Sequence, residues 1–152
     1  DVYKRQPLII AGGGISAQTQ ACSQIVELVD LYPTIAEHTG YQVPSVLEGE
    51  SLVPLLNDPM ADWDKPAISQ VIHSRGQAYG FSLRTDRWRY TEWKRGAAGR
   101  ELYDHANDPD EVSNLADHPE HAALVKRLSE QLKPYVETMS TASESPKKGG
   151  KG

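Results

Sequence analysis

The residues best suited by type to hold a metal ion lie in one acidic segment, Asp104 to Glu111 (DHANDPDE). A calcium-binding EF-hand loop carries oxygen ligands at alternate positions, then a glycine, and ends in a glutamate. Here Pro109 stands in the middle of the segment and the glycine is absent. We therefore expect a tight Asn-Asp-Pro turn rather than a calcium site. Nothing in the sequence would bury two of these carboxylates and separate their pKa values, as acid–base catalysis requires.

Nucleophilic catalysis could draw on a single cysteine, Cys22, which also excludes an internal disulfide. Cys22 lies in a polar stretch and the five histidines are far apart, so the sequence places no nucleophile beside a base. We expect His38 to interact with the carbonyl groups at its helix end rather than with a metal, because no metal-binding residue stands four positions further on. The triglycine Gly12–Gly14 matches neither a dinucleotide-binding fingerprint nor a Walker loop, which indicates a flexible turn.

Basic residues accompany the strand-like part of the chain: Arg75, Arg87, Arg89, Lys94 and Arg95. These groups could bind an anion, or they could form a solvated strand face without a ligand. The net charge of −5 is not concentrated in any long run, so nucleic acid is not expected as a partner. The longest apolar run, Pro7 to Ala11, is much shorter than a membrane span requires, so no membrane association is expected.

The elements that would position these residues centre on Gly80 to Trp93 (GFSLRTDRWRYTEW). Its apolar and polar residues alternate on both sides of Thr85-Asp86-Arg87, which predicts a β-hairpin with one apolar and one cationic face. Further strands beginning near positions 67 and 100, with those near 78 and 87, predict a small four-stranded antiparallel sheet.

A helix near the end of the chain is expected to cover the apolar face of that sheet. Its apolar residues recur at helical spacing: Leu124, Val125, Leu128, Leu132 and Tyr135. Asp117 is placed to cap the start of this helix, and Pro134 is expected to bend or end it near Lys133. We expect residues 139–152, which lack large apolar side chains after Met139, to form a disordered tail.

The first half of the chain predicts a buried strand and a helix. Pro7 to Ala11 reads as a strand of a parallel sheet covered on both faces. Asp30 is expected to cap a helix of about three turns that ends at Gly40, and one helical turn is expected around Leu52 to Leu56. Residues 1–6 (DVYKRQ) resemble a translated sequencing adapter, so we set them aside as an artefact.

Four motifs in order resemble the C-terminal part of a type I sulfatase: VELVDLYPTIAEHTG, LEGESLVPLLNDP, YGFSLRTDRWRYTEW and ELYDHANDPDEVSNLADHPEH. The resemblance covers Pro7 to about Tyr135 and is nearest to the iduronate-2-sulfatase-like branch of this formylglycine-dependent group, within the alkaline phosphatase superfamily. It implies an α+β fragment of an α/β enzyme, in which residues 7–64 end the large α/β domain. Residues 65–138 would form the C-terminal subdomain, an antiparallel sheet packed by a helix.

The resemblance also implies a chemistry that these residues do not supply. Such enzymes hydrolyse sulfate esters with a formylglycine made from the Cys or Ser of a C/S-x-P-x-R motif, beside a calcium ion. Cys22 is followed by Ser-Gln-Ile-Val, so no catalytic, cofactor-binding or metal-binding residue can be assigned here. Ca²⁺ and formylglycine are expected in a missing N-terminal part, and the fragment alone is expected to be inactive.

What the resemblance does suggest is a contact with substrate. The C-terminal subdomain of this family borders the substrate cleft, so His73, Arg75 and Lys94 are predicted to contact a sulfated carbohydrate or related sulfate ester. The parent enzyme would be periplasmic or secreted. Two alternatives stay open: a non-catalytic module that binds an anionic glycan or a partner chain, and a phosphonate or phosphate monoester hydrolase of the same superfamily.

Overall fold

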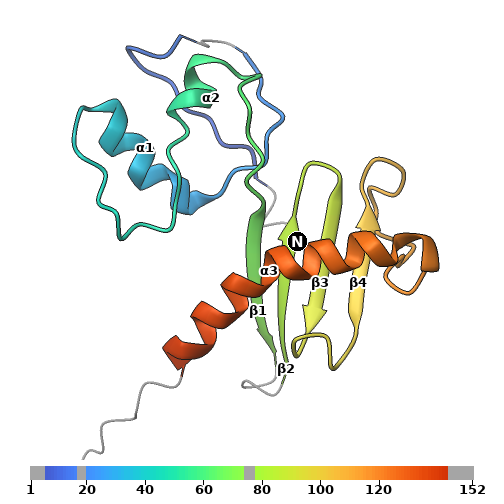
Figure 1. Cartoon of the computed structure of the whole chain (residues 1–152). Helices are drawn as coiled ribbons and strands as arrows, with labels where there is room; N and C mark the ends of the chain where they lie inside the picture. Colours follow the sequence, from blue (N-terminus) through green and yellow to red (C-terminus); the bar gives the residue numbers. More distant parts are fainter. Residues whose placement is uncertain (1–5, 17–19, 74–77, 144–152) are drawn as a thin grey trace, which may run out of the picture. The chain divides into compact units, whose positions relative to one another are not determined.

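The computed structural model describes residues 6–16, 20–73 and 78–143, and the chain divides into two compact units, residues 1–63 and 64–152 (Figure 1). The first unit holds a 3₁₀ turn, η1 (Leu28–Asp30), and helices α1 (Leu31–His38) and α2 (Val53–Asn57). The second holds strands β1 (Ala67–His73), β2 (Ala78–Arg84), β3 (Trp88–Trp93) and β4 (Arg100–Asp104), the 3₁₀ turn η3 (Pro119–His121) and helix α3 (Ala122–Ser143). No helix among these described residues is long and apolar enough to cross a membrane.

The four strands form one antiparallel sheet in the order β1-β2-β3-β4, so each strand pairs with its neighbour in sequence. The register aligns the apolar positions of the strands, because Leu83 pairs with Ile68 on one side and with Tyr90 on the other, and Tyr90 pairs with Leu102. Residues in register point to the same side of a sheet, so the sheet gains one continuous apolar face. The predicted four-stranded antiparallel sheet is confirmed.

Helix α3 crosses this apolar face (Figure 1). The core consists of four sheet residues and four helix residues: Phe81, Leu83, Tyr90, Leu102, Val125, Leu128, Leu132 and Val136. The predicted helix stripe is correct as far as Leu132, but Val136 takes its last position, whereas Tyr135 is 38% exposed. Val136 follows Leu132 by four residues and so lies on the same face, while Tyr135 is turned about 60° away from Leu132.

The two ends of α3 differ from the sequence predictions. Pro119 is the first residue of η3, which makes His118 rather than Asp117 the capping position, and no side chain caps it. Pro134 does not end the helix, which continues to Ser143, so residues 139–143 are helical rather than part of a tail. Pro134 is exposed while Leu132 and Val136 are buried, and their packing offsets the roughly 3 kcal/mol cost of an internal proline. Residues 144–152 lie outside the described residues.

The first unit is organised around a fully buried carboxylate, Asp30. Its Oδ2 accepts the N–H of Glu27 at 2.8 Å, and its Oδ1 accepts the N–H of Glu50 at 2.9 Å. The predicted position of Asp30 at the helix start is correct, but its carboxylate does not bond to an N–H of α1. Instead it ties the start of α1 to a distant segment. The backbone at Gly49 lies so close to the backbone at Val29 that a Cβ on residue 49 would lie 2.1 Å from the carbonyl oxygen of Val29.

Helix α1 spans eight residues, fewer than the three turns predicted, and ends where expected. Gly40 has φ +78°, and the N–H groups of Gly40 and Tyr41 donate to the carbonyl oxygens of Glu37 and Ala36. This is a Schellman ending, in which glycine adopts the left-handed conformation at low cost. The predicted helical turn with buried leucines is also confirmed, because α2 has Leu52 and Leu55 buried at its start and middle.

The strand predicted at Pro7 to Ala11 is not observed, and Ile9 is 85% exposed. A buried strand needs hydrogen-bonded neighbours on its edges, and no strand among the described residues pairs with this segment. His38 also differs from expectation, because its Nε2 lies 3.0 Å from the carbonyl oxygen of Gly13 and not against its own helix end.

Candidate functional site

The residues predicted to contact substrate belong to one end of the sheet. His73 is the last residue of β1 and pairs with Ala78 at the start of β2; its side chain and all of Arg75 lie outside the described residues. Lys94 directly follows β3, and its N–H donates to the carbonyl oxygen of Tyr79 at 2.9 Å. The register therefore brings the end of β1, the start of β2 and the end of β3 together (Figure 1).

The connection from β3 to β4 at this end has an unusual backbone. Lys94 and Arg95 have φ values of 49° and 57°, which side-chain-bearing residues adopt only at a cost of about 1–2 kcal/mol each. Hydrogen bonds across the turn hold it, among them Ala98 N–H to the Trp93 carbonyl at 3.0 Å and Trp93 N–H to the Gly99 carbonyl at 3.1 Å. The turn thus presents two adjacent basic residues, both exposed, from a fixed main chain.

Arg100, the first residue of β4, lies over this turn. A Cβ at Gly96 would come within 2.9 Å of Arg100 Nε and Nη2, and the φ of +82° at Gly96 is one that favours glycine. Arg100 Nε lies 3.9 Å from Glu92 Oε1, a long ion pair in which Arg100 is half exposed and Glu92 is buried. The guanidinium therefore joins the basic turn to a buried carboxylate.

Glu92 connects the sheet end to helix α3. Its Oε1 accepts hydrogen bonds from the hydroxyls of Tyr90 at 2.7 Å and Ser129 at 2.6 Å. Burial, together with the hydrogen bond to this carboxylate, raises the pKa of the Tyr90 phenol well above its ordinary value. Tyr90 and Ser129 therefore act as donors that satisfy the buried carboxylate, and the network fixes β3 against the helix.

Trp93 supports the same sheet end from the other face. Its indole packs so closely on Gly80 that a Cβ there would lie 2.8 Å from the ring, and its Nε1–H donates to Glu101 Oε1 at 2.8 Å. Gly80 and Trp93 are Cα partners across β2 and β3. The indole therefore stabilises the pairing of Gly80 with Trp93, the last residue pair of β2 and β3 before the basic turn.

At the opposite end of the sheet, charged side chains form ion pairs and hydrogen bonds with one another. Arg87 donates from Nε to Asp104 Oδ1 at 2.8 Å and from Nη2 to Asp104 Oδ2 at 2.7 Å, and the guanidinium lies 4.7 Å from the centre of the Trp88 ring. Asn107 Nδ2 donates to Oδ2 of the same carboxylate at 2.7 Å. The Arg87 hydrogen bonds hold the pKa of Asp104 well below its usual range, despite its burial.

The rest of the acidic segment also makes internal contacts. Asp108 accepts the N–H groups of Val112 and Ser113, which lower the pKa of its carboxyl. Glu111 Oε1 lies 2.6 Å from His105 Nε2 and 3.2 Å from Arg89 Nη1. The segment forms turns, as predicted, and the carboxylates of Asp104, Asp108 and Glu111 each accept hydrogen bonds or ion pairs from other protein groups.

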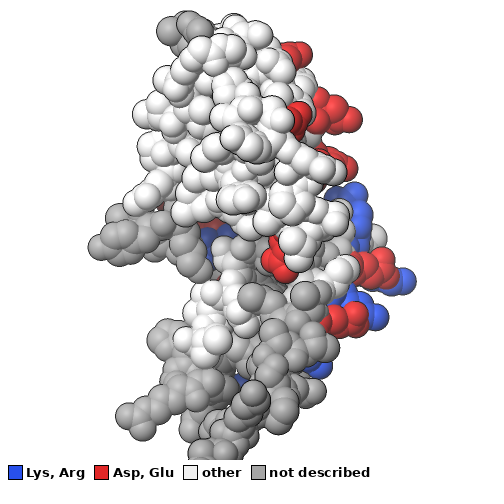
Figure 2. Space-filling model, turned by 90° about the vertical axis from the view of Figure 1, so that its left-hand side faces the viewer, with Lys and Arg blue, Asp and Glu red and all other residues white. Residues whose placement is uncertain are grey.

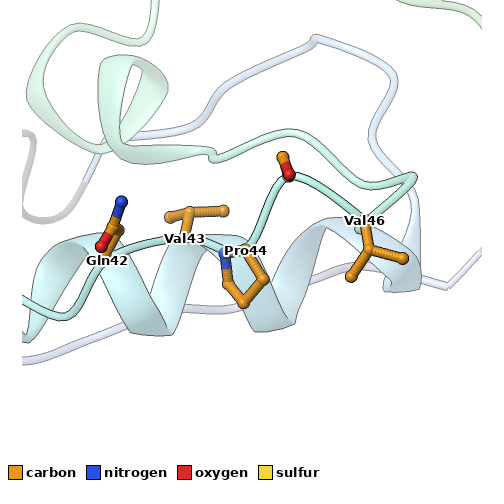
Figure 3. Close-up of a pocket in the computed structure, with 5 residues that line it drawn as sticks. Gln42, Val43, Pro44 and Val46 are labelled. Carbon is orange, nitrogen blue, oxygen red and sulfur yellow. The ribbon is translucent and has the colours of Figure 1, made fainter.

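Two further features of the first unit carry no chemistry that we can identify. Cys22 is exposed, and its thiol lies 3.4 Å from the carbonyl oxygen of Pro59, with no base beside it in any described contact. A shallow surface hollow runs along residues 42–46 beside α1 (Figure 3). Its lining contains no ionisable side chain, and its polar side chains are those of Gln42 and Ser45.

The two units differ in the charged residues that they contain. No lysine or arginine occurs between Arg5 and Lys65, whereas this stretch contains the acidic residues Glu27, Asp30, Glu37, Glu48, Glu50, Asp58, Asp62 and Asp64. Figure 2 shows the acidic side chains in red and the basic side chains in blue on one face. Among the residues that the structure describes, the lysines and arginines that could attract an anionic ligand therefore belong to the second unit.

Sequence reasoning grouped the basic residues but did not separate their roles. Arg87 and Arg89 pair with Asp104 and Glu111, while Lys94 and Arg95 belong to the exposed turn. Arg100 was overlooked because it reads as the first residue of a strand. Gly99 just before it was the available signal, since a glycine ahead of a basic strand start indicates a tight turn.

Comparison with known proteins identifies a family and several relatives that this chain resembles. The family described as N-sulphoglucosamine sulphohydrolase, C-terminal, matches residues 2–138. Arylsulfatase K of Bos taurus is 36% identical over 118 residues, which cover 72% of this chain and 22% of that protein. Delta 4,5-hexuronate-2-O-sulfatase of Bacteroides thetaiotaomicron is 31% identical over 141 residues, which cover 90% of this chain and 29% of that protein. The chain thus spans about a quarter of the length of these curated relatives.

Solved structures show the same relationship. A 2-O GAG sulfatase matches with a TM-score of 0.62 at 30% identity, covering 78% of this chain and 26% of that chain. A protein in complex with its substrate, D-glucosamine-2-N,6-O-disulfate, matches with a TM-score of 0.61 at 27% identity, covering 71% and 23%. The phosphonate monoester hydrolase of Agrobacterium radiobacter matches with a TM-score of 0.55 at 25% identity, covering 72% and 24%.

Proposed function

Because the chain belongs to the N-sulphoglucosamine sulphohydrolase C-terminal family, we propose that it is the C-terminal part of a sulfatase that hydrolyses sulfate esters of carbohydrates. The family match over residues 2–138 carries this proposal. One similar protein is named a hexuronate-2-O-sulfatase, and another was solved with a disulfated glucosamine as its substrate. The four sequence motifs support a place in the iduronate-2-sulfatase-like branch of the type I sulfatases.

The reaction centre in this proposal lies outside the residues of this chain. A formylglycine requires the C/S-x-P-x-R motif, and Cys22 is followed by Ser-Gln-Ile-Val. In the part of the chain that the structure describes, no three His, Cys, Asp or Glu side chains are grouped so that they could hold a metal ion. The described residues of this chain therefore provide neither a formylglycine precursor nor a calcium site. We assign the proposed formylglycine and Ca²⁺ to an upstream part of the protein and expect the chain alone to be inactive.

The role proposed for the present residues is to contact substrate at the end of the sheet. Lys94 and Arg95 are exposed on a turn whose backbone is held by hydrogen bonds, and His73 and Arg75 belong to the adjoining end of β1 and the segment after it. A sulfate group is an anion that ammonium and guanidinium groups bind through charge-assisted hydrogen bonds. A fixed turn reduces the entropy that such a contact costs.

Sulfate release tests the proposal directly. The chain alone, incubated with an aryl sulfate and with a sulfated disaccharide, should release no sulfate. The full-length parent, whose coding sequence upstream of Pro7 should contain a C/S-x-P-x-R motif, should release it. In that parent, Lys94→Ala should raise KM for the disaccharide by about tenfold with little change in kcat, because a rim contact stabilises ground and transition states alike. Lys126→Ala, on the exposed side of α3, is the control. A parent without the motif and without turnover would overturn the assignment.

A second candidate is a non-catalytic module that binds an anionic glycan through the basic turn. The strained backbone at Lys94 and Arg95 favours it, because such strain occurs at binding sites. The chain alone would then be retained on a heparin column in a salt-dependent manner, and Arg75→Ala with Lys94→Ala would abolish retention. The match to a phosphonate monoester hydrolase supports a third candidate, which a phosphonate ester offered to the full-length parent would reveal.

A further inference from the structure

The guanidinium of Arg100 is used differently from that of Arg87, at the other end of the sheet. Arg87 donates hydrogen bonds to both carboxylate oxygens of Asp104, at 2.8 and 2.7 Å. Arg100 has its own carboxylate, that of Glu92, at 3.9 Å, which is too long for a hydrogen bond. Within the part of the chain that the structure describes, the Arg100 guanidinium makes no hydrogen bond. A guanidinium has five N–H donors, so those of Arg100 are available to a ligand.

The surrounding structure nevertheless fixes the position of Arg100. Its guanidinium lies over Gly96, where an added Cβ would come within 2.9 Å of two of its nitrogens. Its carbonyl oxygen accepts a hydrogen bond from Asn114 Nδ2 at 3.0 Å, and its Cα partner on β3 is Glu92. Its side chain is 49% exposed, so a ligand can reach it. A guanidinium that is already positioned loses little conformational entropy when it binds an anion.

Two further cations belong to the turn that precedes Arg100. We call residues 94–99 the basic turn; it begins with Lys94 and Arg95, and both are exposed. From Lys94 to Arg100 (KRGAAGR) the sequence has three cations and no carboxylate. Glu92 and Glu101, on the strands beside the turn, already accept hydrogen bonds from two hydroxyl groups and from an indole. The basic turn and Arg100 therefore present positive charge to an anion.

The backbone of the basic turn indicates that its two cationic side chains have a use. Lys94, Arg95 and Gly96 follow one another in the left-handed region, with φ of 49°, 57° and 82°. Glycine adopts this conformation at low cost, whereas lysine and arginine are strained in it. Backbone strain of this kind collects at binding sites, so it favours a role of Lys94 and Arg95 in binding rather than in forming the turn.

The proposed function indicates which anion these cations meet. The sulfate ester that is hydrolysed would lie at the formylglycine, and the described residues of this chain supply neither its precursor nor a calcium site. The cations of this chain therefore contact another group of the same substrate. We propose that Arg100, together with Lys94 and Arg95, binds a second anionic group of the carbohydrate, a carboxylate or a sulfate that is not hydrolysed. This inference rests on the proposed function, and it makes Arg100 a residue that selects substrates with at least two anionic groups.

Binding of small anionic sugars to the chain tests the site without turnover. The chain, labelled with ¹⁵N, is titrated with an unsulfated chondroitin disaccharide, which carries one carboxylate, and with 6-sulfated N-acetyllactosamine, which carries one sulfate. Lactose is the uncharged control. We expect an anionic probe to shift the amide signals of residues 94–100 with a Kd of about 1–10 mM, and lactose to shift none. A response to one anionic probe alone identifies the group that is bound, and no response to either probe would overturn the proposal.

Two matched arginine substitutions separate this site from general charge attraction. Arg100→Gln should raise the Kd of the anionic probe about tenfold, because it removes charge-assisted hydrogen bonds. Arg127→Gln removes the same charge from an exposed position of α3 and should change the Kd less than about twofold. Equal losses from the two variants would overturn the proposal. If Arg100→Gln is unfolded by circular dichroism, Lys94→Gln, at an exposed position of the same turn, provides the comparison.

A second measurement uses the selectivity of the full-length parent. The ratio of kcat/KM for a disaccharide with two anionic groups to kcat/KM for an aryl sulfate should fall about tenfold in Arg100→Gln and stay unchanged in Arg127→Gln. An unchanged ratio in Arg100→Gln would overturn the proposal. If the parent releases no sulfate from any substrate while the chain still binds the anionic probes through Arg100, the sulfatase assignment fails and the anion site stands. The two failures are therefore distinguishable.

Discussion

Arg87 holds Asp104 through two parallel hydrogen bonds, Nε to Oδ1 at 2.8 Å and Nη2 to Oδ2 at 2.7 Å. The two residues flank the sheet end at which β3 begins and β4 finishes. The carboxylate is buried and also accepts Asn107 Nδ2, so it fixes the start of the acidic segment. Two-point pairing of this kind is both stronger and more directional than a single contact.

Removing the charge of Asp104 should weaken the second unit. Asp104→Asn replaces a charged acceptor by an amide and should lower the free energy of unfolding by about 1–3 kcal/mol. Urea denaturation followed by tryptophan fluorescence measures this, since Trp88 lies beneath Arg87. Asp110→Asn, at an exposed position of the same segment, should change stability by less than about 0.5 kcal/mol and serves as the control. Equal effects from the two variants would contradict the role assigned to the pair.

The same contact predicts a dependence of stability on pH. The pKa of Asp104 is depressed in the folded protein, while in the unfolded chain it lies near the ordinary value of about 3.9. Its contribution is therefore complete above about pH 4 and is lost as the pH falls through the lower folded value. Unfolding free energies measured between about pH 5 and pH 2 should fall more steeply for the wild-type chain than for Asp104→Asn. Parallel curves would show that other carboxylates cause the loss.

The helix register can be tested with adjacent substitutions on α3. Leu132 is fully buried against the sheet, so Leu132→Ala should cost about 2–5 kcal/mol through lost burial and the cavity left behind. Tyr135→Ala removes a larger but partly exposed side chain and should cost less than about 1.5 kcal/mol. Thermal unfolding by circular dichroism compares the two. A larger loss for Tyr135→Ala would restore the stripe predicted from the sequence.

Gly49 should tolerate no side chain. A Cβ at this position would lie 2.1 Å from the Val29 carbonyl oxygen and 3.0 Å from Asp30 N, both of them backbone atoms that cannot move away independently. Gly49→Ala should therefore destabilise the first unit by at least about 2 kcal/mol. Limited proteolysis, read as cleavage between residues 41 and 52, reports on this unit separately. Gly12→Ala, where no atom lies within 4 Å of the added Cβ, is the matched control and should leave the cleavage rate unchanged.

Local patterns in the sequence were enough to predict much of the second unit. The alternation around Phe81 and Tyr90 and the helical spacing from Val125 to Leu132 depend on neighbouring residues, so they can be read without knowing the fold. The predicted strands and the covering helix are confirmed by the structure. The order of the four motifs also indicated the sulfatase family, to which the chain belongs.

The tertiary structure decided what local patterns cannot encode. Whether Val136 or Tyr135 completes the core depends on how α3 lies across the sheet, and Pro134 is accommodated because its neighbours are packed. The segment at Pro7 to Ala11 has the composition of a buried strand, but a strand exists only with partners that hydrogen-bond to its edges.

Charged groups show the same division most clearly. The sequence alone could group the basic residues, but it could not say that Arg87 is paired while Lys94 is exposed on a turn. Nor could it show that Asp30 is buried and accepts the N–H of Glu50, which lies 20 residues along the chain. Secondary structure follows from the periodicity of side chains near one another in sequence, whereas ion pairing and burial follow from the register and packing that bring distant residues together.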